Sequence, residues 1–254
     1  MSDTAVKQVW DEYYAATSGD TVLKDANFFR MEIAALSKAL NSEVERIGRS
    51  VSILELGSGT GALAEALLAA LPKAAREGTT YQGVDFAADA CAKADSRGLS
   101  GASFTAQDFL SYLEQETQQF DIITSQRSVM AVIDPDDQRK MLRGMHNRLK
   151  PGGKIFLSEG TRQGFERLNY LRAEIGIAPM APIWHCLYLD EEEVRSEFPD
   201  VQFDDYASLY WLITRVIYPF SAEPQHNTRL HDMAAALPQT GDHGLVKLIV
   251  ASST

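Results

Sequence analysis

Apolar residues recur at helical spacing over the first fifty positions of the chain. Between Val6 and Thr17 they fall on one side of a helix, and Ser18-Gly19-Asp20 interrupts the pattern. A second stretch with the same spacing runs over residues 27–48, where Gly48 is a typical helix stop. The pattern therefore predicts two N-terminal helices separated by a short polar break.

From residue 51 onward, short apolar runs alternate with helical stretches. The apolar runs predict strands at residues 51–56, 81–86, 102–106, 120–125 and 154–158. Helices are predicted between them at residues 61–71, 87–96 and 109–116, and another after Asp134, a typical N-cap, with Pro135 in its first turn. This alternation indicates an α/β fold with a parallel sheet that is covered on both faces. Such a sheet binds ligands at the carboxyl ends of its strands, so we expect site residues directly after each strand.

The pattern is less regular beyond residue 160. Residues 161–205 are rich in aromatic residues and prolines, which predicts an insertion over the site. Residues 206–217 form a β-branched and aromatic run, and residues 245–251 a final apolar run. We expect these two runs to be strands that pair antiparallel at the sheet edge. The predicted organisation is a helical lid over residues 1–49, a core over 50–160, the insertion over 161–205 and C-terminal strands over 206–254.

Composition and charge narrow the class of protein. Apolar residues make up 45% of the 254 positions, which excludes a disordered or collagen-like chain. The net charge of −11 disfavours nucleic acid and anionic membrane surfaces as partners. Cys91 and Cys186 are too few for a disulfide framework or a zinc cluster, and we predict no metal site. There is no secretory signal and no apolar run of about 18 residues, so we expect a cytoplasmic protein.

The strongest motif lies where the first predicted strand runs into glycines, over residues 53–61. Gly57 and Gly59 allow a sharp turn and a close approach of the backbone to a ligand. The helix that follows presents free N–H groups and a partial positive charge. Together with Ala62, these glycines also satisfy the dinucleotide pattern Gly-x-Gly-x-x-Gly/Ala. The motif therefore predicts a loop that binds a nucleotide-like ligand.

Two acidic residues follow the next predicted strands. Asp85 ends the second strand, where a carboxylate accepts hydrogen bonds from both hydroxyls of a ribose. Asp108 follows the third strand, where it would accept from an adenine amino group while Phe109 stacks on the base. Each acid alone is typical of a solvated strand end, but both at successive strand ends beside a glycine loop predict a nucleoside site.

Together these motifs resemble a known family. Glu55-Leu-Gly-Ser-Gly-Thr-Gly61, Val84-Asp85, Gln107-Asp108, Phe120-Asp-Ile-Ile123 and Leu149-Lys-Pro-Gly-Gly-Lys154 resemble the class I S-adenosylmethionine-dependent methyltransferases over residues 50–160. The resemblance implies a Rossmann-like, seven-stranded, mostly parallel sheet with helices on both faces and an antiparallel last strand. It implies S-adenosylmethionine as the cofactor, bound by the core. The segment before the fifth strand distinguishes the chain from a nicotinamide-dependent Rossmann enzyme.

The resemblance also implies roles for individual residues. Gly57, Gly59 and Gly61 would line the methionine part of the cofactor, and Glu55 would organise the loop or the cofactor amine. Asp85 would hold the ribose, and Asp108 and Phe109 the adenine. The N-terminal helices would form a lid in which Arg30 pairs with the cofactor carboxylate; the alternative is an amphipathic helix that packs on the sheet and leaves Arg30 exposed. The full set of expected cofactor-binding residues is Glu55, Gly57, Ser58, Gly59, Gly61, Asp85, Phe86, Asp108, Phe109, Ser125, Arg30 and Tyr14.

The acceptor side is less determined. Residues 125–128 lack the Asn/Asp-Pro-Pro-Tyr/Phe motif of enzymes that methylate amide or base nitrogens. We expect a small organic acceptor, with O-methylation slightly favoured, methylated by in-line displacement. The expected catalytic residues are Arg127, Glu159 and His185; the last lies in an aromatic segment and is either a base or a core histidine. Further polar candidates are Arg162, Tyr188 and Arg215.

Other functions stay open at this point. A protein or tRNA/rRNA methyltransferase, a non-catalytic cofactor-binding regulatory subunit and a nicotinamide-dependent oxidoreductase are the alternatives. Acidity and the lack of a basic tract count against a nucleic-acid acceptor. A homodimer is compatible with the sequence.

Overall fold

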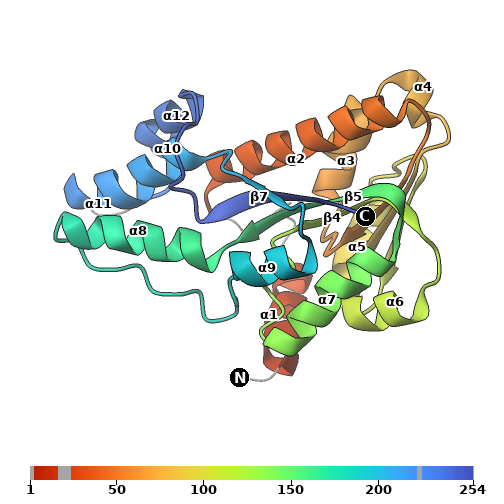
Figure 1. The fold of residues 1–254 in the computed structure, drawn as a ribbon, viewed down its shortest axis with the longest axis horizontal. Helices are drawn as coiled ribbons and strands as arrows, with labels where there is room; N and C mark the ends of the chain where they lie inside the picture. The colour runs from red at the N-terminus through yellow and green to blue at the C-terminus, as the bar shows by residue number, and fades with distance from the viewer. Residues whose placement is uncertain (1–2, 17–23, 222–224, 254) are drawn as a thin grey trace.

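A seven-stranded sheet forms the centre of the computed structural model, which describes residues 3–16, 24–221 and 225–253 (Figure 1). The strand order is β3-β2-β1-β4-β5-β7-β6. Strands β1 to β5 pair in parallel, whereas β7 is antiparallel to both β5 and β6. The strands are β1 (Ser52–Leu56), β2 (Thr80–Asp85), β3 (Ala102–Ala106), β4 (Phe120–Gln126), β5 (Leu149–Gly160), β6 (Gln202–Asp204) and β7 (Val246–Ser252). The predicted fold class, including the antiparallel last strand, is confirmed.

Helices cover both faces of this sheet. The core on one face is built from α2 (Ala26–Ile47) and α3 (Ala62–Ala70), and on the other from α6 (Phe109–Gln115), α7 (Pro135–Asn147) and α9 (Glu191–Glu197). The short α4 (Lys73–Arg76) follows α3, and α5 (Ala88–Ser96) lies against β2 and β3. Asp134 caps α7 as expected, accepting hydrogen bonds from the N–H groups of Asp136 and Asp137. This cap, together with the apolar residues that α7 buries against the sheet, explains why the segment is helical.

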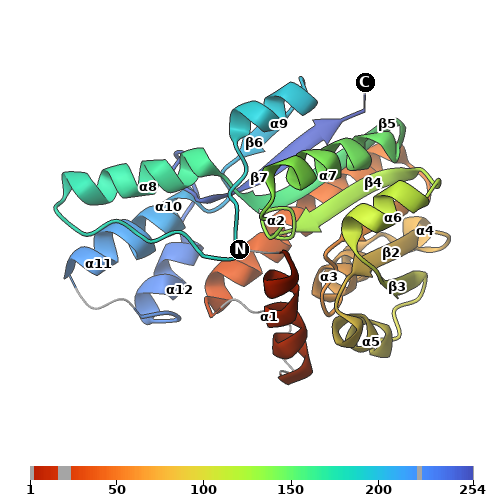
Figure 2. The same cartoon turned by 90° about the horizontal axis from the view of Figure 1, so that it is seen from below.

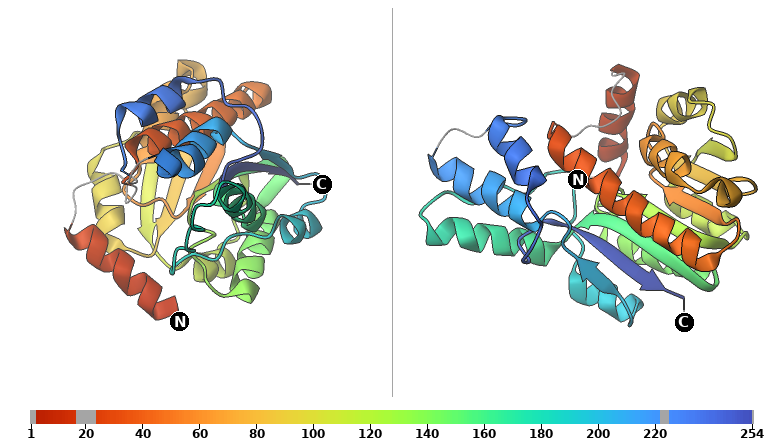
Figure 3. Two further views of the ribbon diagram at one scale, coloured as in Figure 1. Left: turned by 90° about the vertical axis from the view of Figure 1, so that its left-hand side faces the viewer. Right: turned by 90° about the horizontal axis from the view of Figure 1, so that it is seen from above.

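A separate group of helices lies beside the sheet, formed by α8 (Arg162–Glu174), α10 (Ser208–Trp211), α11 (Tyr218–Ser221) and α12 (Arg229–Ala236). Figures 1 and 3 show this group gathered around the N-terminal end of α2. The predicted strand over residues 206–217 is wrong, because α10 continues into a π-helical turn, Leu212–Ile217. Tyr210, Trp211 and Val216 bury their side chains there with Phe28 and Leu168. This packing outweighs the β propensity of the segment, and the strand that pairs with β7 is instead β6.

The two N-terminal helices have different roles. Leu36, Leu40 and Val44 of α2 lie in the core on one face of the sheet, so most of α2 is a structural layer. Helix α1 (Asp3–Ala16) instead lies near α5, between the group of helices beside the sheet and the glycine loop (Figure 2). The lid stays a prediction, and α1 is the helix that contributes Trp10 and Tyr14 to the cavity over the glycine loop. Within the described residues, no helix is long and apolar enough to cross a membrane.

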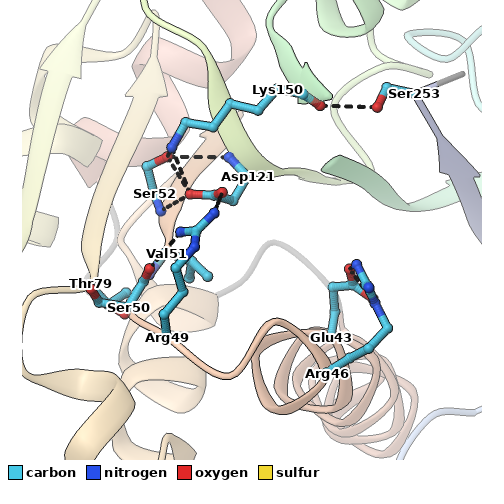
Figure 4. Close-up of polar contacts among 10 residues, drawn as sticks. All are labelled: Glu43, Arg46, Arg49, Ser50, Val51, Ser52, Thr79, Asp121, Lys150 and Ser253. Atoms are coloured by element: carbon cyan, nitrogen blue, oxygen red, sulfur yellow. Dashed lines mark hydrogen bonds and ion pairs between the residues drawn. The ribbon is translucent and has the colours of Figure 1, made fainter. Parts of the chain in front are cut away.

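A buried carboxylate ties together the strands at the end of the sheet opposite the glycine loop. Asp121 of β4 accepts hydrogen bonds from Arg49 Nη2 at 2.7 Å, Lys150 Nζ at 2.8 Å and the backbone N–H of Ser52 at 2.8 Å (Figure 4). Burial would raise the pKa of Asp121, but the hydrogen bonds from Arg49, Lys150 and Ser52 outweigh it and hold that pKa well below its usual range. The contact fixes the start of β1 against β4, and with it the position of the loop that follows β1.

Candidate active site

The glycine loop has the left-handed backbone that its sequence predicts. Gly57, Gly59 and Gly61 have φ angles of 80°, 49° and 77°, which favour glycine. A Cβ at Gly57 would lie 1.7 Å from Ser128 Oγ, so a side chain there would displace the loop after β4. The backbone N–H of Gly59 donates to Asp85 Oδ2 at 2.9 Å. The loop is therefore held between the ends of β2 and β4.

A cavity lies over this loop, and we call it the cofactor cavity. It is lined by Trp10, Tyr14, Phe29, Gly57, Ser58, Gly59, Thr60, Ala62, Leu63, Asp85, Phe86, Phe109, Gln126, Arg127, Ser128 and Ala131. Seven of the expected cofactor-binding residues lie there: Tyr14, Gly57, Ser58, Gly59, Asp85, Phe86 and Phe109. Burial raises the pKa of Asp85, although the N–H groups of Ala87 and Gly59 act against that shift. The cavity thus presents one carboxylate, that of Asp85, among five aromatic residues: Trp10, Tyr14, Phe29, Phe86 and Phe109.

Asp108 lies next to this cavity, in a smaller adjoining cavity with Phe86, Phe109 and Leu110. Its Oδ1 caps α6 by accepting from the N–H of Ser111, and its Oδ2 binds Lys7 Nζ of α1 at 2.7 Å. Burial would raise the pKa of Asp108, but Lys7 and Ser111 lower it below the usual value. The carboxylate is therefore ionised, and its adenine-binding role stays a prediction.

Four expected cofactor residues do not line the cofactor cavity or the smaller one. Glu55 is buried under the loop, where its Oε2 accepts from Tyr81 at 2.7 Å and burial raises its pKa to about 8. Gly61 is needed for packing, because a Cβ would lie 3.1 Å from that of Ala94. Ser125 is buried and donates to Glu159, and the exposed Arg30 donates to Asn27. The expectations that Arg30 binds the cofactor carboxylate and that Ser125 binds the cofactor have no support in this geometry.

Glu159 supports the loop after β4 instead of facing an acceptor. Its Oε1 accepts from Ser125 Oγ at 2.9 Å and from the N–H groups of Ser128 and Val129 at 3.0 Å, and its Oε2 accepts from the N–H of Met130 at 3.0 Å. Its side chain is fully buried, and burial raises its pKa to about 7 against the effect of these donors. Glu159 lines neither cavity, so this geometry gives no support to a catalytic role, and we infer that it positions the loop.

Arg127 is where the loop after β4 meets a second cavity. It has a φ of 56°, which is unusual for a residue other than glycine, and its Nε donates to Glu32 of α2 at 3.0 Å. Glu32 is fully buried and also accepts from Gln126 and Ser158. The guanidinium of Arg127 is therefore held in place at the boundary between two cavities.

We call the second cavity the acceptor cavity. It has a volume of about 720 Å³, within the roughly 300–1,000 Å³ of sites that enclose small molecules. Its wall is largely aromatic and aliphatic. It is lined by Val9, Trp10, Tyr13, Lys24, Asp25, Phe28, Arg127, Met130, Phe165, Met180, Ala181, Ile183, His185, Cys186, Tyr188, Trp211, Arg215, His226, Leu245 and Val246. Of the polar candidates, Arg127, His185, Tyr188 and Arg215 lie in it, whereas Glu159 and Arg162 do not.

His185 lies in an aromatic part of the acceptor cavity. Its ring lies edge-on to Trp10 and Trp184, with ring centroids 5.4 Å and 4.9 Å apart. Its Nδ1 is buried and has no hydrogen-bond partner among the described residues. Burial lowers the pKa of His185, so the ring is uncharged at neutral pH.

Sequence reasoning missed Lys24, Asp25, Trp211 and His226, which form one end of the acceptor cavity with Arg215. Asp25 and Arg215 are 190 positions apart, so no spacing rule connects them. Asp25, His226 and His231 bring ligand-type atoms within 4.8 Å of one another. However, Arg215 Nη2 already binds Asp25 Oδ2, and a metal cation at the same oxygen would be repelled.

Comparisons with known proteins agree with this geometry. Residues 53–153 match the methyltransferase domain family. The ubiquinone biosynthesis O-methyltransferase of Pseudomonas syringae pv. tomato is 33% identical over 112 residues, which is 42% of this chain and 43% of that protein. The protein of the same name in Citrobacter koseri is 27% identical over 127 residues, or 49% and 47% of the two chains. The chain thus spans less than half of the length of these curated relatives.

Several solved structures match nearly the whole chain. The N-methyltransferase NodS of Bradyrhizobium japonicum, with S-adenosyl-L-homocysteine, has a TM-score of 0.58 at 15% identity and 98% coverage of both chains. The magnesium protoporphyrin IX methyltransferase of Synechocystis, with bound S-adenosylmethionine, has a TM-score of 0.56 at 12% identity and covers 100% of this chain and 98% of its own. The predicted resemblance is therefore confirmed: residues 53–153 match a methyltransferase domain, and the chain has the fold of the class I S-adenosylmethionine-dependent methyltransferases.

Proposed function

We propose that this protein transfers the methyl group of S-adenosylmethionine to a small organic acceptor, with an oxygen atom favoured as the methylated atom. The observation that carries the proposal is that the cofactor and acceptor cavities meet at Trp10 and Arg127, which line both. A donor over the glycine loop and an acceptor in the apolar cavity would face each other there.

The residues of the cofactor cavity fit S-adenosylmethionine. Ser58 Oγ and Thr60 Oγ1 are buried and have no hydrogen-bond partner among the described residues, although both residues line the cavity. Buried hydroxyls without partners are costly, so a polar ligand at this position would stabilise the loop. Asp85 offers acceptor oxygens to the ribose hydroxyls, and Phe86 and Phe109 offer apolar faces to the adenine. Tyr14 closes the cavity from α1, its hydroxyl 3.0 Å from where a Cβ of Gly59 would lie.

The chain's own residues would align the acceptor and remove its proton. S-adenosylmethionine, when bound, supplies a methyl group already activated for in-line displacement. Arg127 is fixed by Glu32 and would orient a polar atom of the acceptor at the cavity boundary. Neutral His185 would accept the hydroxyl proton of the acceptor at Nδ1. Trp10 and Tyr14 of α1 would exclude water from the reacting atoms.

A small acceptor is favoured over a macromolecule because the acceptor cavity has the volume of a small-molecule site. A catalytic role is favoured over a regulatory one because the cavity is open beside the cofactor position and contains an unpartnered His185 nitrogen. The experiment below distinguishes this proposal from two alternatives: methylation of a protein or of tRNA or rRNA, and a nicotinamide-dependent oxidoreductase.

The test begins with calorimetric titration of the protein with S-adenosylmethionine, S-adenosylhomocysteine, NAD and NADP. A ligand at a hundred times its dissociation constant also stabilises the protein by about 2.7 kcal/mol, which a thermal scan detects. We expect binding of the two adenosyl ligands alone. Methyl transfer from labelled S-adenosylmethionine to a library of phenols and hydroxylated heterocycles then tests the activity. Binding of a nicotinamide cofactor instead, or transfer to protein or RNA but to no small molecule, would refute the proposal.

A further inference from the structure

The end of the acceptor cavity that lies away from the cofactor concentrates charged groups in an otherwise apolar wall. We propose that the acceptor is an elongated apolar molecule bearing a carboxylate, and that Arg215 and Lys24 bind this carboxylate at that end. The proposal rests on the methyltransferase function proposed above, and it names the chemical class of the acceptor.

Arg215 is prepared to bind an anion. Its guanidinium lies 5.2 Å from the centre of the Trp211 ring, and its side chain is only 17% exposed. Within the described residues, its one side-chain hydrogen bond runs from Nη2 to Asp25 Oδ2. A guanidinium carries five N–H donors in a planar fork, so most of them remain for a ligand. A carboxylate is the partner that this fork matches in shape and charge.

Asp25 orients Arg215 and is itself committed to other contacts. Its Oδ1 accepts from the N–H of Phe28 at 3.0 Å and from Tyr210 Oη at 2.5 Å. Burial would raise the pKa of Asp25, but these bonds and Arg215 lower it, so the carboxylate is ionised. Counting Lys24 and Arg215 as positive and Asp25 as negative leaves one positive charge at this end of the cavity. That charge suits a monoanion such as a carboxylate better than a dianionic phosphate.

The length of α2 between Asp25 and Glu32 gives the distance between the charged end of the acceptor cavity and the end at Arg127. Arg127 binds Glu32, and Arg215 binds Asp25, the N-cap of the same helix. Seven residues at the rise of an α-helix separate these two anchors by about 10 Å along its axis. Under the proposed function the reacting atom lies near Arg127 and His185, so we expect the carboxylate of the acceptor about 10 Å from that atom. The wall between the two ends includes Phe28, Phe165 and Trp211, which suit a body of two rings.

Matched probes test this directly. The first is the biphenyl with a hydroxyl on one para position and a carboxylate on the other, whose two rings span a similar length. The second is its primary carboxamide, which has the same shape without the charge, and the third is para-hydroxybenzoate, which is one ring shorter. Binding of each is measured by calorimetry to the full chain saturated with S-adenosylhomocysteine. We expect the biphenyl acid to bind at least tenfold more tightly than either of the others.

Three variants assign this preference to residues. In Arg215→Met the tenfold preference for the acid over the amide should disappear, and in Lys24→Gln it should fall severalfold. Arg195→Met removes one positive charge from the exposed face of α9, outside the cavity, and should leave the preference unchanged. If Arg215→Met fails to fold because Asp25 loses its partner, Lys24→Gln and the acid–amide comparison decide the matter.

The proposal is overturned if the amide binds as tightly as the acid, if neither biphenyl binds, or if the preference survives in Arg215→Met. If S-adenosylhomocysteine itself does not bind, the proposed methyltransferase function is refuted, and the charge of the acceptor is not what that result tests. Transfer to neutral phenols with no gain from a carboxylate would retain the proposed function and refute only this inference.

Discussion

Replacing Glu159 by glutamine tests whether this carboxylate positions the loop after β4. Glu159 accepts four hydrogen bonds, three of them at Oε1 and one at Oε2 from the N–H of Met130. A glutamine keeps one acceptor oxygen, which can serve the three donors at Oε1. Its amino group would then face the Met130 N–H, and two buried donors would oppose each other. An unsatisfied buried donor costs about 1–3 kcal/mol, so we expect Glu159→Gln to lower the free energy of unfolding by that amount.

Urea denaturation followed by tryptophan fluorescence measures the change. Glu65→Gln is the matched control, because it makes the same substitution at a carboxylate that is 54% exposed and paired with Arg97. We expect the control to stay within about 0.5 kcal/mol of the parent protein. The variant should also raise the KM for the acceptor, because the loop carries Arg127. A Glu159→Gln protein as stable as the control would refute the hydrogen-bond reasoning.

The remaining predictions concern three other carboxylates or rings. Asp85→Ala should weaken S-adenosylmethionine binding at least tenfold, because a buried carboxylate–hydroxyl contact contributes about 1.5–3 kcal/mol; calorimetry against the exposed Asp89→Ala control measures it. His185→Gln should lower kcat by roughly 10²–10⁴-fold, because the ring is proposed as the base, and an unchanged kcat contradicts that role. Burial lowers the pKa of His185, so the acid limb of the parent protein's kcat/KM profile should lie below pH 6.5. Asp121→Asn should destabilise the fold by about 1–3 kcal/mol at pH 7. Because the folded pKa of Asp121 is lowered, its contribution is present above the unfolded value near 3.9 and lost as the pH falls, so the difference between parent and variant should shrink in acid denaturation series.

Much of the sheet and the cofactor cavity could be predicted because their determinants are local. The apolar run of β1, the glycines at positive φ and the cap of α7 all depend on residues within a few positions of one another. Parallel pairing then places Asp85 at the same sheet edge as the glycine loop, as the strand register confirms. Residues 206–217 show where this reasoning fails: local propensity favours a strand, but burial of Tyr210 and Trp211 against Phe28 favours a helix.

The sequence by itself determined the order of strands and helices, the glycine loop and the acidic strand ends, since periodicity and turn chemistry act over short distances. Only the tertiary structure decided which polar side chains are partnered. Glu159 accepts hydrogen bonds from the loop after β4 and therefore positions that loop. Arg215 binds Asp25, which is 190 positions away in the chain, and lines the acceptor cavity. The physical reason is that the role of a charged group depends on its burial and its partners, and both arise from segments that are distant in the chain.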